Sequence, residues 1–456
     1  MTRKQGIKDY GKDIWSGSNM KKVAFFTLGC KVNQYETEAV SELFKNAGYQ
    51  LVGFDYMADV YIINTCTVTN LSDKKSRQMI RKAKKNNPDG IVVAMGCYAQ
   101  VSKEEVEKIE GVDIVMGTKD RIKVLEWVGD YLKNKQSGIT TSITRVHDIM
   151  KAHEFEALSI HDFSDRTRAY IKIQDGCNQF CAYCIIPYAR GTVRSKNLDD
   201  IHNEVVSLVS NGFKEIVLTG IHLASYGKDT NINLVDVFRK LDNIVGLERI
   251  RLGSLEPNVV SDDFVNYISQ HKKICPQFHL SLQSGCDETL LRMNRKYTTE
   301  EYRTSANLLK NKIKDATLTT DIIVGFPGES EEEFQKTLLF AEEIAFSKIH
   351  VFKFSARKGT KAFSMKNKVA PELKEERAKI LSDLSNKLQR DFIEKYLGEQ
   401  VEILLDGKEE NGKYMHGYTS NYIKVVVEAP ELMKGAILKV LIVKSQNDCL
   451  NGIIVS

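Results

Sequence analysis

The sequence has little proline and no long hydrophobic run. Only 7 of its 456 residues are Pro, which argues against a largely disordered or linker-like chain. No window approaches the ~18 consecutive apolar residues of a membrane span. Residues 1–20 lack the apolar core and the small-residue cleavage site of a secretory signal. We therefore expect a soluble cytoplasmic protein.

The chain also has only a small excess of positive over negative charge, because its formal net charge is +5. Any contact with nucleic acid must then come from local basic patches. Apolar residues make up 42% of the chain, which is ample material for packed cores. At roughly 100–200 residues per domain, the length suggests two to four domains.

Nine cysteines are the most informative feature. An odd number excludes complete pairing into disulfides, and a cytosolic location disfavours disulfides in any case. Six of the nine fall into two groups of three, on which the functional interpretation depends. The others, Cys275, Cys286 and Cys449, have no partner pattern and are expected to be structural.

Between residues 21 and 150, apolar runs alternate with amphipathic stretches. Strands are expected over 21–30, 59–66 and 90–97. Helices are expected over 35–49, over 71–87 with Ser72 at its start, and over 103–111. This alternation predicts an open parallel α/β domain.

Cys30, Cys66 and Cys97 each lie at the carboxyl end of one of these strands. Ligands of open α/β sheets bind outside those strand ends, so the three thiols are expected to meet. The alternative is three separate buried cysteines, since free Cys is often a small core residue. Three thiolates suit zinc or an iron–sulfur cluster. A structural zinc usually takes four protein ligands, so three favour a reactive cluster with one open position.

The segment 71–87 is strongly basic, with only Asp73 opposing its cations. These cations are Lys74, Lys75, Arg77, Arg81, Lys82, Lys84 and Lys85. One interpretation is a solvated helix face. The other is a phosphate-binding surface, because the segment directly follows the Cys66 strand and cations on an anionic backbone release counterions. The sequence alone leaves both open.

Residues 165–357 show about six further strand–helix alternations, which predict a full or partial βα barrel with its chemistry at the carboxyl strand ends. The expected strands are 168–177, 215–220, 248–257, 278–285, 316–326 and 348–356. A helix is expected over 330–345, where Ser330 and Glu333 form the pattern of a capping box.

The first of these strands leads into the loop Cys177, Cys181 and Cys184, a C-x₃-C-x₂-C spacing. It is too crowded for disulfides among its own members, and no Cys or His follows until His202 to complete a zinc site. Three thiolates can hold three corners of a cubic cluster and leave the fourth iron open. This loop, with the aromatic Tyr183 before its last Cys, resembles the signature of the radical S-adenosylmethionine (SAM) enzymes.

Polar groups and glycines at the predicted strand ends are the candidates for holding the cofactor. Together with Tyr183 they are Gly220, Arg251, Ser254, Glu256, Gln283, Ser284 and Asp321. Glycine lets the backbone approach a ligand, and a carboxylate can accept hydrogen bonds from ribose hydroxyls. The string GFPGE at 325–329 is expected to be only a turn before a helix.

The last hundred residues begin with an expected long helix over 374–398 and then change to period-two alternation. This predicts a small antiparallel β-barrel of about 60 residues. Residues 397–456 hold six Lys against eight Asp and Glu and no Arg, which makes them a poor RNA-binding surface by charge. The polar and aromatic residues that would stack on or hydrogen-bond unpaired bases are Tyr414, His416, Tyr418, Asn421 and Tyr422. The alternative is that the aromatics form the core of a hairpin.

The whole arrangement resembles the methylthiotransferases from about Lys21 onward. The resemblance implies an N-terminal domain at 21–150, a radical SAM core at 163–395 and a barrel called TRAM at 397–456. Four strings look like the bacterial threonylcarbamoyladenosine tRNA methylthiotransferases (the MtaB type): GCKVNQYETE, NTCTVTNLSDKKSR, LTGIHLASYG and SLQSGCDETLLRMNRKYT. The first 20 residues fall outside this pattern and are expected to be an extension.

The implied reaction replaces a hydrogen by a methylthio group at C2 of threonylcarbamoyladenosine at position 37, beside the anticodon. Cys177, Cys181 and Cys184 would hold the [4Fe-4S] cluster that cleaves SAM, and the resulting radical would remove the adenine hydrogen. Cys30, Cys66 and Cys97 would hold an auxiliary [4Fe-4S] cluster that delivers sulfur, and a second SAM would supply the methyl group.

The resemblance also implies partners: the tRNA anticodon stem-loop, a flavodoxin- or ferredoxin-like electron donor and a sulfur donor, with no membrane. RNA contacts are expected from six of the basic residues of 71–87 and from two tyrosines of the barrel. They are Lys74, Lys75, Arg77, Arg81, Lys82, Lys85, Tyr418 and Tyr422. One alternative is a methylthiotransferase acting on isopentenyladenosine tRNA or on a ribosomal protein. An alternative from another class is a non-catalytic RNA-binding protein stabilised by metal.

Overall fold

The structure, a computed structural model, describes residues 20–139, 141–161, 166–410, 412–446 and 448–455. The expected extension at residues 1–20 lies outside this range except for Met20. The chain divides into two compact units. The first contains the residues up to Ile160 together with Ile185–Thr192, and the second contains His161–Cys184 and the residues from Val193 onward.

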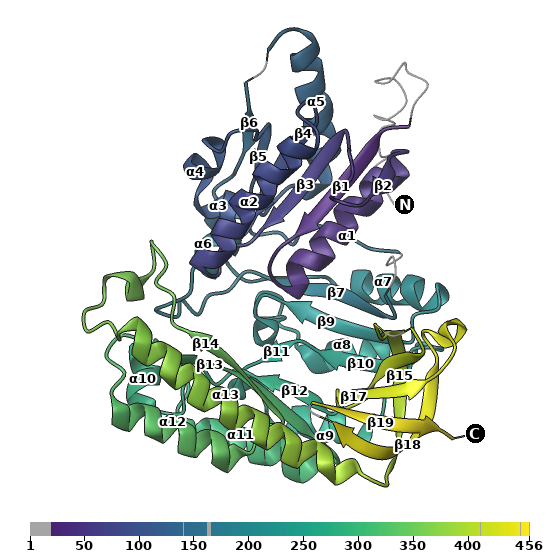
Figure 1. Cartoon of the computed structure of the whole chain (residues 1–456), viewed down its shortest axis with the longest axis vertical. Helices are drawn as coiled ribbons and strands as arrows, with labels where there is room; N and C mark the ends of the chain where they lie inside the picture. Colours follow the sequence, from purple (N-terminus) through teal and green to yellow (C-terminus); the bar gives the residue numbers. More distant parts are fainter. Residues whose placement is uncertain (1–19, 140, 162–165, 411, 447, 456) are drawn as a thin grey trace. The chain divides into compact units, whose positions relative to one another are not determined.

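The described part of the first unit is built on a six-stranded parallel sheet with the order β2-β1-β3-β4-β5-β6 (Figure 1). Its strands are β1 (Lys22–Thr27), β2 (Gln50–Val52), β3 (Val60–Thr65), β4 (Ile91–Gly96), β5 (Ile114–Met116) and β6 (Ile143–Arg145). The strands β3 and β4 are buried throughout, as expected of a parallel sheet covered on both faces. The predicted parallel α/β fold is confirmed.

Helices connect these strands. They are α1 (Lys31–Asn46), α2 (Asn70–Asn86), α3 (Cys97–Val101), α4 (Lys103–Glu107), α5 (Val124–Gln136) and, from the later segment, α6 (Ile186–Arg190). The expected start of α2 at Ser72 was wrong, because the Thr69 side chain accepts the hydrogen bond from the backbone N–H of Ser72 and caps the helix. Likewise α1 begins at Lys31 rather than at residue 35, so its amino end lies directly beside Cys30.

The second unit contains the predicted βα half-barrel as two four-stranded sheets, β10-β9-β7-β8 and β11-β12-β13-β14. Its strands are β7 (Arg168–Asp175), β8 (Arg194–Ser195), β9 (Glu215–Gly220), β10 (Arg249–Leu252), β11 (Ser254–Leu255), β12 (Gln277–Leu280), β13 (Thr317–Val324) and β14 (Lys348–Lys353). All pairings are parallel except that of the short β8 with β7. The strand expected over 248–257 is interrupted at Gly253, where the chain passes from one sheet to the other.

The helices of the second unit are α7 (Leu198–Ser210), α8 (Leu234–Leu241), α9 (Asp262–Gln270), α10 (Asp287–Arg292), α11 (Thr299–Lys312), α12 (Glu331–Ile344) and α13 (Pro371–Ile393). The predicted capping box is present at α12, where Ser330 and Glu333 exchange side-chain and backbone hydrogen bonds. Helices α11, α12 and α13 lie along one side of the sheet β11–β14 (Figure 1). No helix in the described part of the chain is long and apolar enough to cross a membrane.

The chain ends in a closed barrel with the order β15-β16-β17-β19-β18. Its strands are β15 (Gln400–Lys408), β16 (Tyr414–Thr419), β17 (Lys424–Glu428), β18 (Ile437–Gln446) and β19 (Cys449–Ile454). The predicted barrel is confirmed, although β17 and β19 pair in parallel rather than antiparallel. That pairing closes the sheet on itself and removes its exposed edges.

A turn of this barrel, Thr419–Tyr422, is held against the amino ends of the half-barrel strands. Arg251 on β10 donates to the carbonyls of Ser420 and Thr419, at 2.8 and 3.3 Å. Thr317, at the start of β13, donates its hydroxyl to the carbonyl of Asn421 at 2.9 Å. The C-terminal barrel therefore covers the end of the half-barrel opposite to the carboxyl strand ends.

Candidate active site

The three N-terminal thiols come together because three adjacent strands end at one edge of the sheet. Cys30 follows β1, Cys66 follows β3, and Cys97 follows β4, and these strands are direct neighbours in the order β1-β3-β4. The Asn33 side chain accepts from the Cys30 thiol at 4.0 Å and from Arg190, which also donates to the Cys97 sulfur, so Cys30 and Cys97 lie beside the same polar groups. Their role as cluster ligands stays a prediction.

Two glycines make this convergence possible. Gly29 and Gly96 directly precede Cys30 and Cys97 and have φ values of +104° and +101°, which side chains disfavour. A Cβ on Gly29 would lie 3.0 Å from the Cys66 sulfur, and one on Gly96 only 2.4 Å from an oxygen of Asn64. Only glycine therefore allows the chain to turn beside the sheet edge at both thiols.

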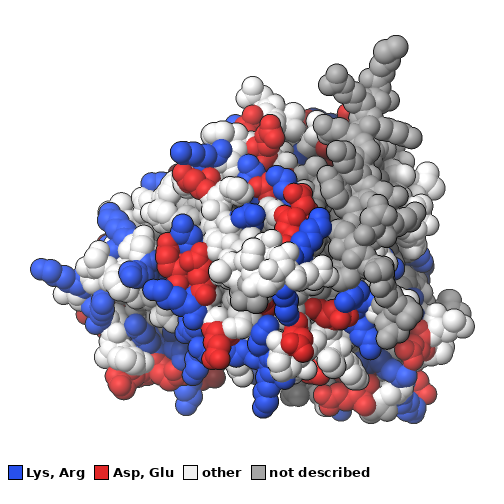
Figure 2. All heavy atoms as spheres, turned by 90° about the horizontal axis from the view of Figure 1, so that it is seen from above, with Lys and Arg blue, Asp and Glu red and all other residues white. Residues whose placement is uncertain are grey.

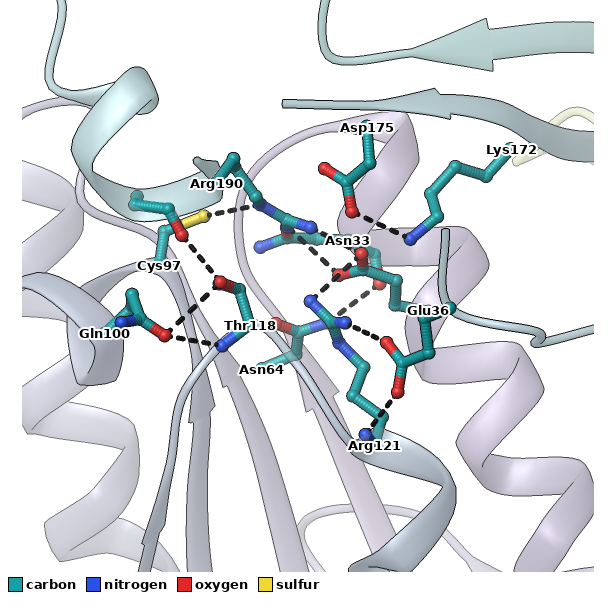
Figure 3. Close-up of polar contacts among 12 residues, drawn as sticks. Asn33, Glu36, Asn64, Cys97, Gln100, Thr118, Arg121, Lys172, Asp175 and Arg190 are labelled. Atoms are coloured by element: carbon teal, nitrogen blue, oxygen red, sulfur yellow. Dashed lines mark hydrogen bonds and ion pairs between the residues drawn. The ribbon is translucent and has the colours of Figure 1, made fainter. Parts of the chain in front are cut away.

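Arg190, on the short helix α6, is the central polar group beside Cys97 (Figure 3). Its Nε donates to the Cys97 sulfur at 3.2 Å, and its Nη2 donates to the Asn33 side chain at 2.5 Å. The same guanidinium forms a two-pronged ion pair with Glu36. Arg190 and Glu36 are both completely buried. The guanidinium thus connects a thiol to a fixed carboxylate.

A second buried arginine completes this network. Arg121 lies 3.0 Å from Glu36 through its Nη2 and donates to Glu156 through its Nη1 at 2.5 Å (Figure 3). Burial raises the pKa of the Cys97 thiol to about 12, while the positive charge of Arg190 acts in the opposite direction. Arg190 therefore favours the thiolate form that a metal requires.

In the second unit, the loop with Cys177, Cys181 and Cys184 begins where β7 ends. Gln174 donates to the carbonyls of Asp175 and Gly176, at 2.8 and 2.7 Å, and Asp175 accepts from the Gly176 N–H at 2.9 Å. Gly176 takes the positive φ of +74° that the turn into the loop requires. These contacts fix the entry to the three-thiol loop.

Arg295 has the same kind of contact with this second set of thiols. Its Nη1 donates to the Cys181 sulfur at 3.2 Å, and its Nη2 donates to Glu256 at 2.7 Å. Glu256 also lies 3.0 Å from a ring nitrogen of His222 and accepts from Gln179 at 3.3 Å. Burial disfavours the charge of Glu256, but the contacts with His222 and Arg295 lower its pKa below the usual value. The carboxylate therefore stays ionised.

The other predicted cofactor residues lie in several different surroundings. The Tyr183 ring packs edge-on against Phe326, with 6.4 Å between centroids. Gly220 lies at the end of β9, where a Cβ would come within 2.8 Å of Gln174. Gln283 has a φ of +71° just after β12. Ser284 shares a buried hydrogen bond with Thr337.

The last three predicted cofactor residues, Arg251, Ser254 and Asp321, are not in contact with the three-thiol loop through any of the hydrogen bonds described above. Arg251 is paired with Glu215 at 2.7 Å and bound to the turn of the C-terminal barrel, so its guanidinium has a structural role at the opposite end of the strands. Ser254 and Asp321 lie on the partly open face of the sheet β11–β14. Contact of Ser254 and Asp321 with SAM stays a prediction.

The donor chemistry of both thiol sets fits iron–sulfur clusters. In a cubic cluster each thiolate binds a different iron, so three thiols match three of its corners. The assignment of either set to a cluster stays a prediction.

Sequence reasoning missed Arg190, Arg295 and His222. Each lies within or beside a motif: Arg190 six residues after Cys184, His222 in LTGIHLASYG and Arg295 in SLQSGCDETLLRMNRKYT. An arginine carries no periodic signal that would mark it as a partner of a thiol. The one signal for His222 and Arg295 is that each lies in one of the four strings that carry the resemblance.

The residues predicted to bind RNA differ in their surroundings. On α2, the side chains of Lys74, Lys75, Arg81 and Lys85 are exposed, whereas Arg77 donates to Tyr98 at 2.9 Å. Lys82 is paired with Asp55. The described basic and acidic side chains are interspersed on the face that Figure 2 presents.

The two tyrosines of the barrel stack on each other at 4.8 Å between ring centroids. The guanidinium of Arg168 lies 4.6 Å from the Tyr418 ring centroid and 5.3 Å from that of Tyr422. Tyr422 also meets the Arg251 guanidinium, at 4.7 Å. These rings therefore belong largely to the packing of the barrel on β7 and β10.

Comparison with known proteins shows the family of the chain. The uncharacterized protein family UPF0004 matches residues 22–117, and the radical SAM superfamily matches residues 171–341. A solved radical SAM methyltransferase, TsrM from Kitasatospora setae with cobalamin and a [4Fe-4S] cluster bound, covers 74% of this chain and 75% of its own, with a TM-score of 0.54. At 14% identity, this likeness shows the fold alone.

The chain is 46% identical over 432 residues to the threonylcarbamoyladenosine tRNA methylthiotransferase MtaB of Bacillus subtilis (strain 168), covering 93% of this chain and 94% of the relative. It is 41% identical to the MtaB of Aquifex aeolicus (strain VF5), covering 92% of this chain and all of that protein. The tRNA-2-methylthio-N(6)-dimethylallyladenosine synthase of Alkaliphilus oremlandii (strain OhILAs) is 35% identical, covering 96% of this chain and 94% of that protein.

The half-barrel, its three-thiol loop and the superfamily match define a radical SAM enzyme. Such enzymes use SAM and a [4Fe-4S] cluster, as the three-thiol loop requires. Within this class, the chain belongs to the threonylcarbamoyladenosine tRNA methylthiotransferases.

We expect Arg190→Met to lower the free energy of unfolding by about 3–5 kcal/mol, because it breaks a buried ion pair and removes the hydrogen bond to Cys97. Chemical denaturation of the metal-free protein measures this loss. Arg145→Met is the matched control, since Arg145 is exposed and should change stability by less than about 0.5 kcal/mol. Equal stability of Arg190→Met and wild type would contradict the role given to this network.

Proposed function

We propose that this enzyme replaces the hydrogen at C2 of N6-threonylcarbamoyladenosine, at position 37 of tRNA, with a methylthio group. The observation that carries the proposal is the presence of two separate sets of three thiols, each beside a buried guanidinium. One set suits a cluster that binds SAM, and the other suits a cluster that carries sulfur. The higher identity to relatives named for threonylcarbamoyladenosine, 46% and 41% against 35%, favours this substrate over dimethylallyladenosine.

The clusters and SAM supply, when bound, the radical that removes the hydrogen and the sulfur and methyl group that replace it. The chain itself positions these groups. Cys177, Cys181 and Cys184 hold the SAM-binding cluster, and Arg295 with Glu256 fixes the orientation of the Cys181 side chain.

Cys30, Cys66 and Cys97 hold the auxiliary cluster, and Arg190 orients Cys97 from a segment six residues beyond Cys184. For SAM itself we propose contacts from the polar groups and glycine beside the SAM-binding loop. These are Tyr183, Gly220, Glu256, Gln283 and Ser284. The anticodon base must be unstacked to react, which a single-stranded loop permits at modest cost.

The proposed partners are the tRNA anticodon stem-loop, a flavodoxin- or ferredoxin-like electron donor and a sulfur donor. A tRNA substrate favours a cytoplasmic location. We propose that residues 21–150 form the auxiliary-cluster domain, 163–395 the radical SAM core and 397–456 the TRAM barrel. The family matches over 22–117 and 171–341 support the first two of these.

Deletion of the encoding gene should abolish the methylthio derivative of threonylcarbamoyladenosine in cellular tRNA. Mass spectrometry of tRNA nucleosides measures this loss, and expression of the intact protein should restore the derivative. Loss of a methylthio derivative of isopentenyladenosine instead would assign the alternative substrate. An unchanged set of methylthio nucleosides would contradict tRNA methylthiolation altogether.

Substitutions in the two thiol sets should separate the two half-reactions. We expect Cys177→Ala to abolish formation of 5′-deoxyadenosine from SAM, and Cys66→Ala to spare it while abolishing methylthiolation. Iron analysis after anaerobic reconstitution should give about eight irons for wild type and about four for each variant, if every cubic cluster holds four. Cys275→Ala is the control, because Cys275 lies outside both sets. Methylthiolation by Cys66→Ala would contradict the auxiliary site.

The exposed cations of α2 should supply part of the affinity for tRNA. Replacing Lys74, Lys75, Arg81 and Lys85 with Glu should weaken binding, and the logarithmic slope of affinity against salt should fall by about 0.7–0.9 per lost phosphate contact. The double variant Lys133→Glu/Lys135→Glu on α5 controls for net charge against the double variant Lys74→Glu/Lys75→Glu, which changes the charge equally. An unchanged salt slope would show that this face of α2 is only solvated.

A further inference from the structure

In the described part of the chain, helices cover one face of the sheet β11–β14, and the other face is partly open. On β13, Leu318, Ile322 and Val324 are buried, whereas Asp321 and Ile323 between them are half-buried. The strands of parallel sheets are normally buried on both faces. A parallel sheet with one partly open face therefore presents a surface on which a ligand can lie.

The open face carries a cluster of polar side chains on neighbouring strands. His279 on β12 pairs in register with Ser254 on one side and Thr319 on the other, and Asp321 pairs with His350 on β14. Residues that pair in register point to the same face of a sheet. We call these five residues the polar wall.

The polar wall is organised by its own contacts. The two ring nitrogens of His279 lie 3.0 Å from the Thr319 hydroxyl and 3.3 Å from the Asp321 carboxylate. The His279 and His350 rings lie 5.8 Å apart between centroids, and His350 is exposed. The wall therefore combines imidazole donors with hydroxyl and carboxylate acceptors on one surface.

The position of the wall along the strands also matters. At the amino end of β13, the hydroxyl of Thr317 is bound to the turn of the C-terminal barrel. Asp321 is four residues further, roughly 13 Å along an extended strand. Beyond the wall, Ile323 and the exposed Phe352 offer apolar surface nearer to the carboxyl strand ends. An adenine ring on this apolar surface would have its N6 substituent over the polar wall.

We propose that the polar wall binds the threonylcarbamoyl substituent of the target adenosine and so determines substrate choice, an inference that rests on the proposed function. This substituent carries a carboxylate, a hydroxyl and a urea group. His350 donates to the carboxylate, and Asp321 accepts from the hydroxyl or the urea N–H. A dimethylallyl group has no polar atom and would gain none of these hydrogen bonds.

The test compares two anticodon stem-loops, one with threonylcarbamoyladenosine at position 37 and one with unmodified adenosine. Their dissociation constants are measured with the reconstituted full-length enzyme and SAM. We expect wild type to prefer the modified stem-loop by roughly tenfold to a hundredfold, as for hydrogen bonds to a charged group. His350→Ala, an exposed position, and the double variant His279→Ala/His350→Ala should bring the ratio close to one.

His202→Ala, on α7, is the control and should keep the wild-type ratio. Retention of the wild-type preference by both wall variants would overturn the inference, as would a wild type that makes the methylthio product but binds both stem-loops equally. A wild type that makes no product from the modified stem-loop would instead contradict the proposed function, so the two failures are distinguishable. Cleavage of SAM by the variants, measured separately, shows that they are folded and loaded.

Discussion

The buried contact of Arg190 with Cys97 and Glu36 is the interaction on which the N-terminal thiol site depends. A thiol at the end of a buried strand loses the solvation that would favour its charged form. Arg190 supplies a compensating positive charge, and Glu36 with Arg121 fixes where that charge lies. The parallel sheet brings the three sulfurs to one edge, but this guanidinium makes the edge suitable for an anionic ligand set.

The radical SAM loop uses the same arrangement with different residues. Arg295 contacts the Cys181 sulfur and is held by the buried carboxylate of Glu256. In each unit, one guanidinium donates to one of the three thiols and is itself held by a buried carboxylate. Hydrogen bonds to a cluster's sulfurs tune its potential and orient its ligands, so with clusters bound both arginines would act by positioning a cysteine ligand.

Most of the architecture could be predicted from the sequence, because the spacing of apolar residues along a strand or helix follows which side chains are buried. The alternation before Cys30, Cys66 and Cys97 placed each thiol at a strand end, and the parallel sheet then requires their convergence. Polar partners were less predictable. Arg251 lies on a strand near the expected site, yet its guanidinium turns to the C-terminal barrel, a contact 169 residues away that no local pattern encodes. Arg190 joins the first unit only through the folded chain, because in sequence it follows the other thiol loop.

The central claim is that the two thiol sets hold separate clusters, of which only one binds SAM. Pulsed electron paramagnetic resonance of the reduced protein with SAM labelled at its carboxylate oxygens tests this most directly. The account predicts hyperfine coupling to the label in the wild type and in Cys97→Ala, and its loss in Cys181→Ala. Coupling that survives in Cys181→Ala, or that disappears in Cys97→Ala, would contradict the division of chemistry between the two sites.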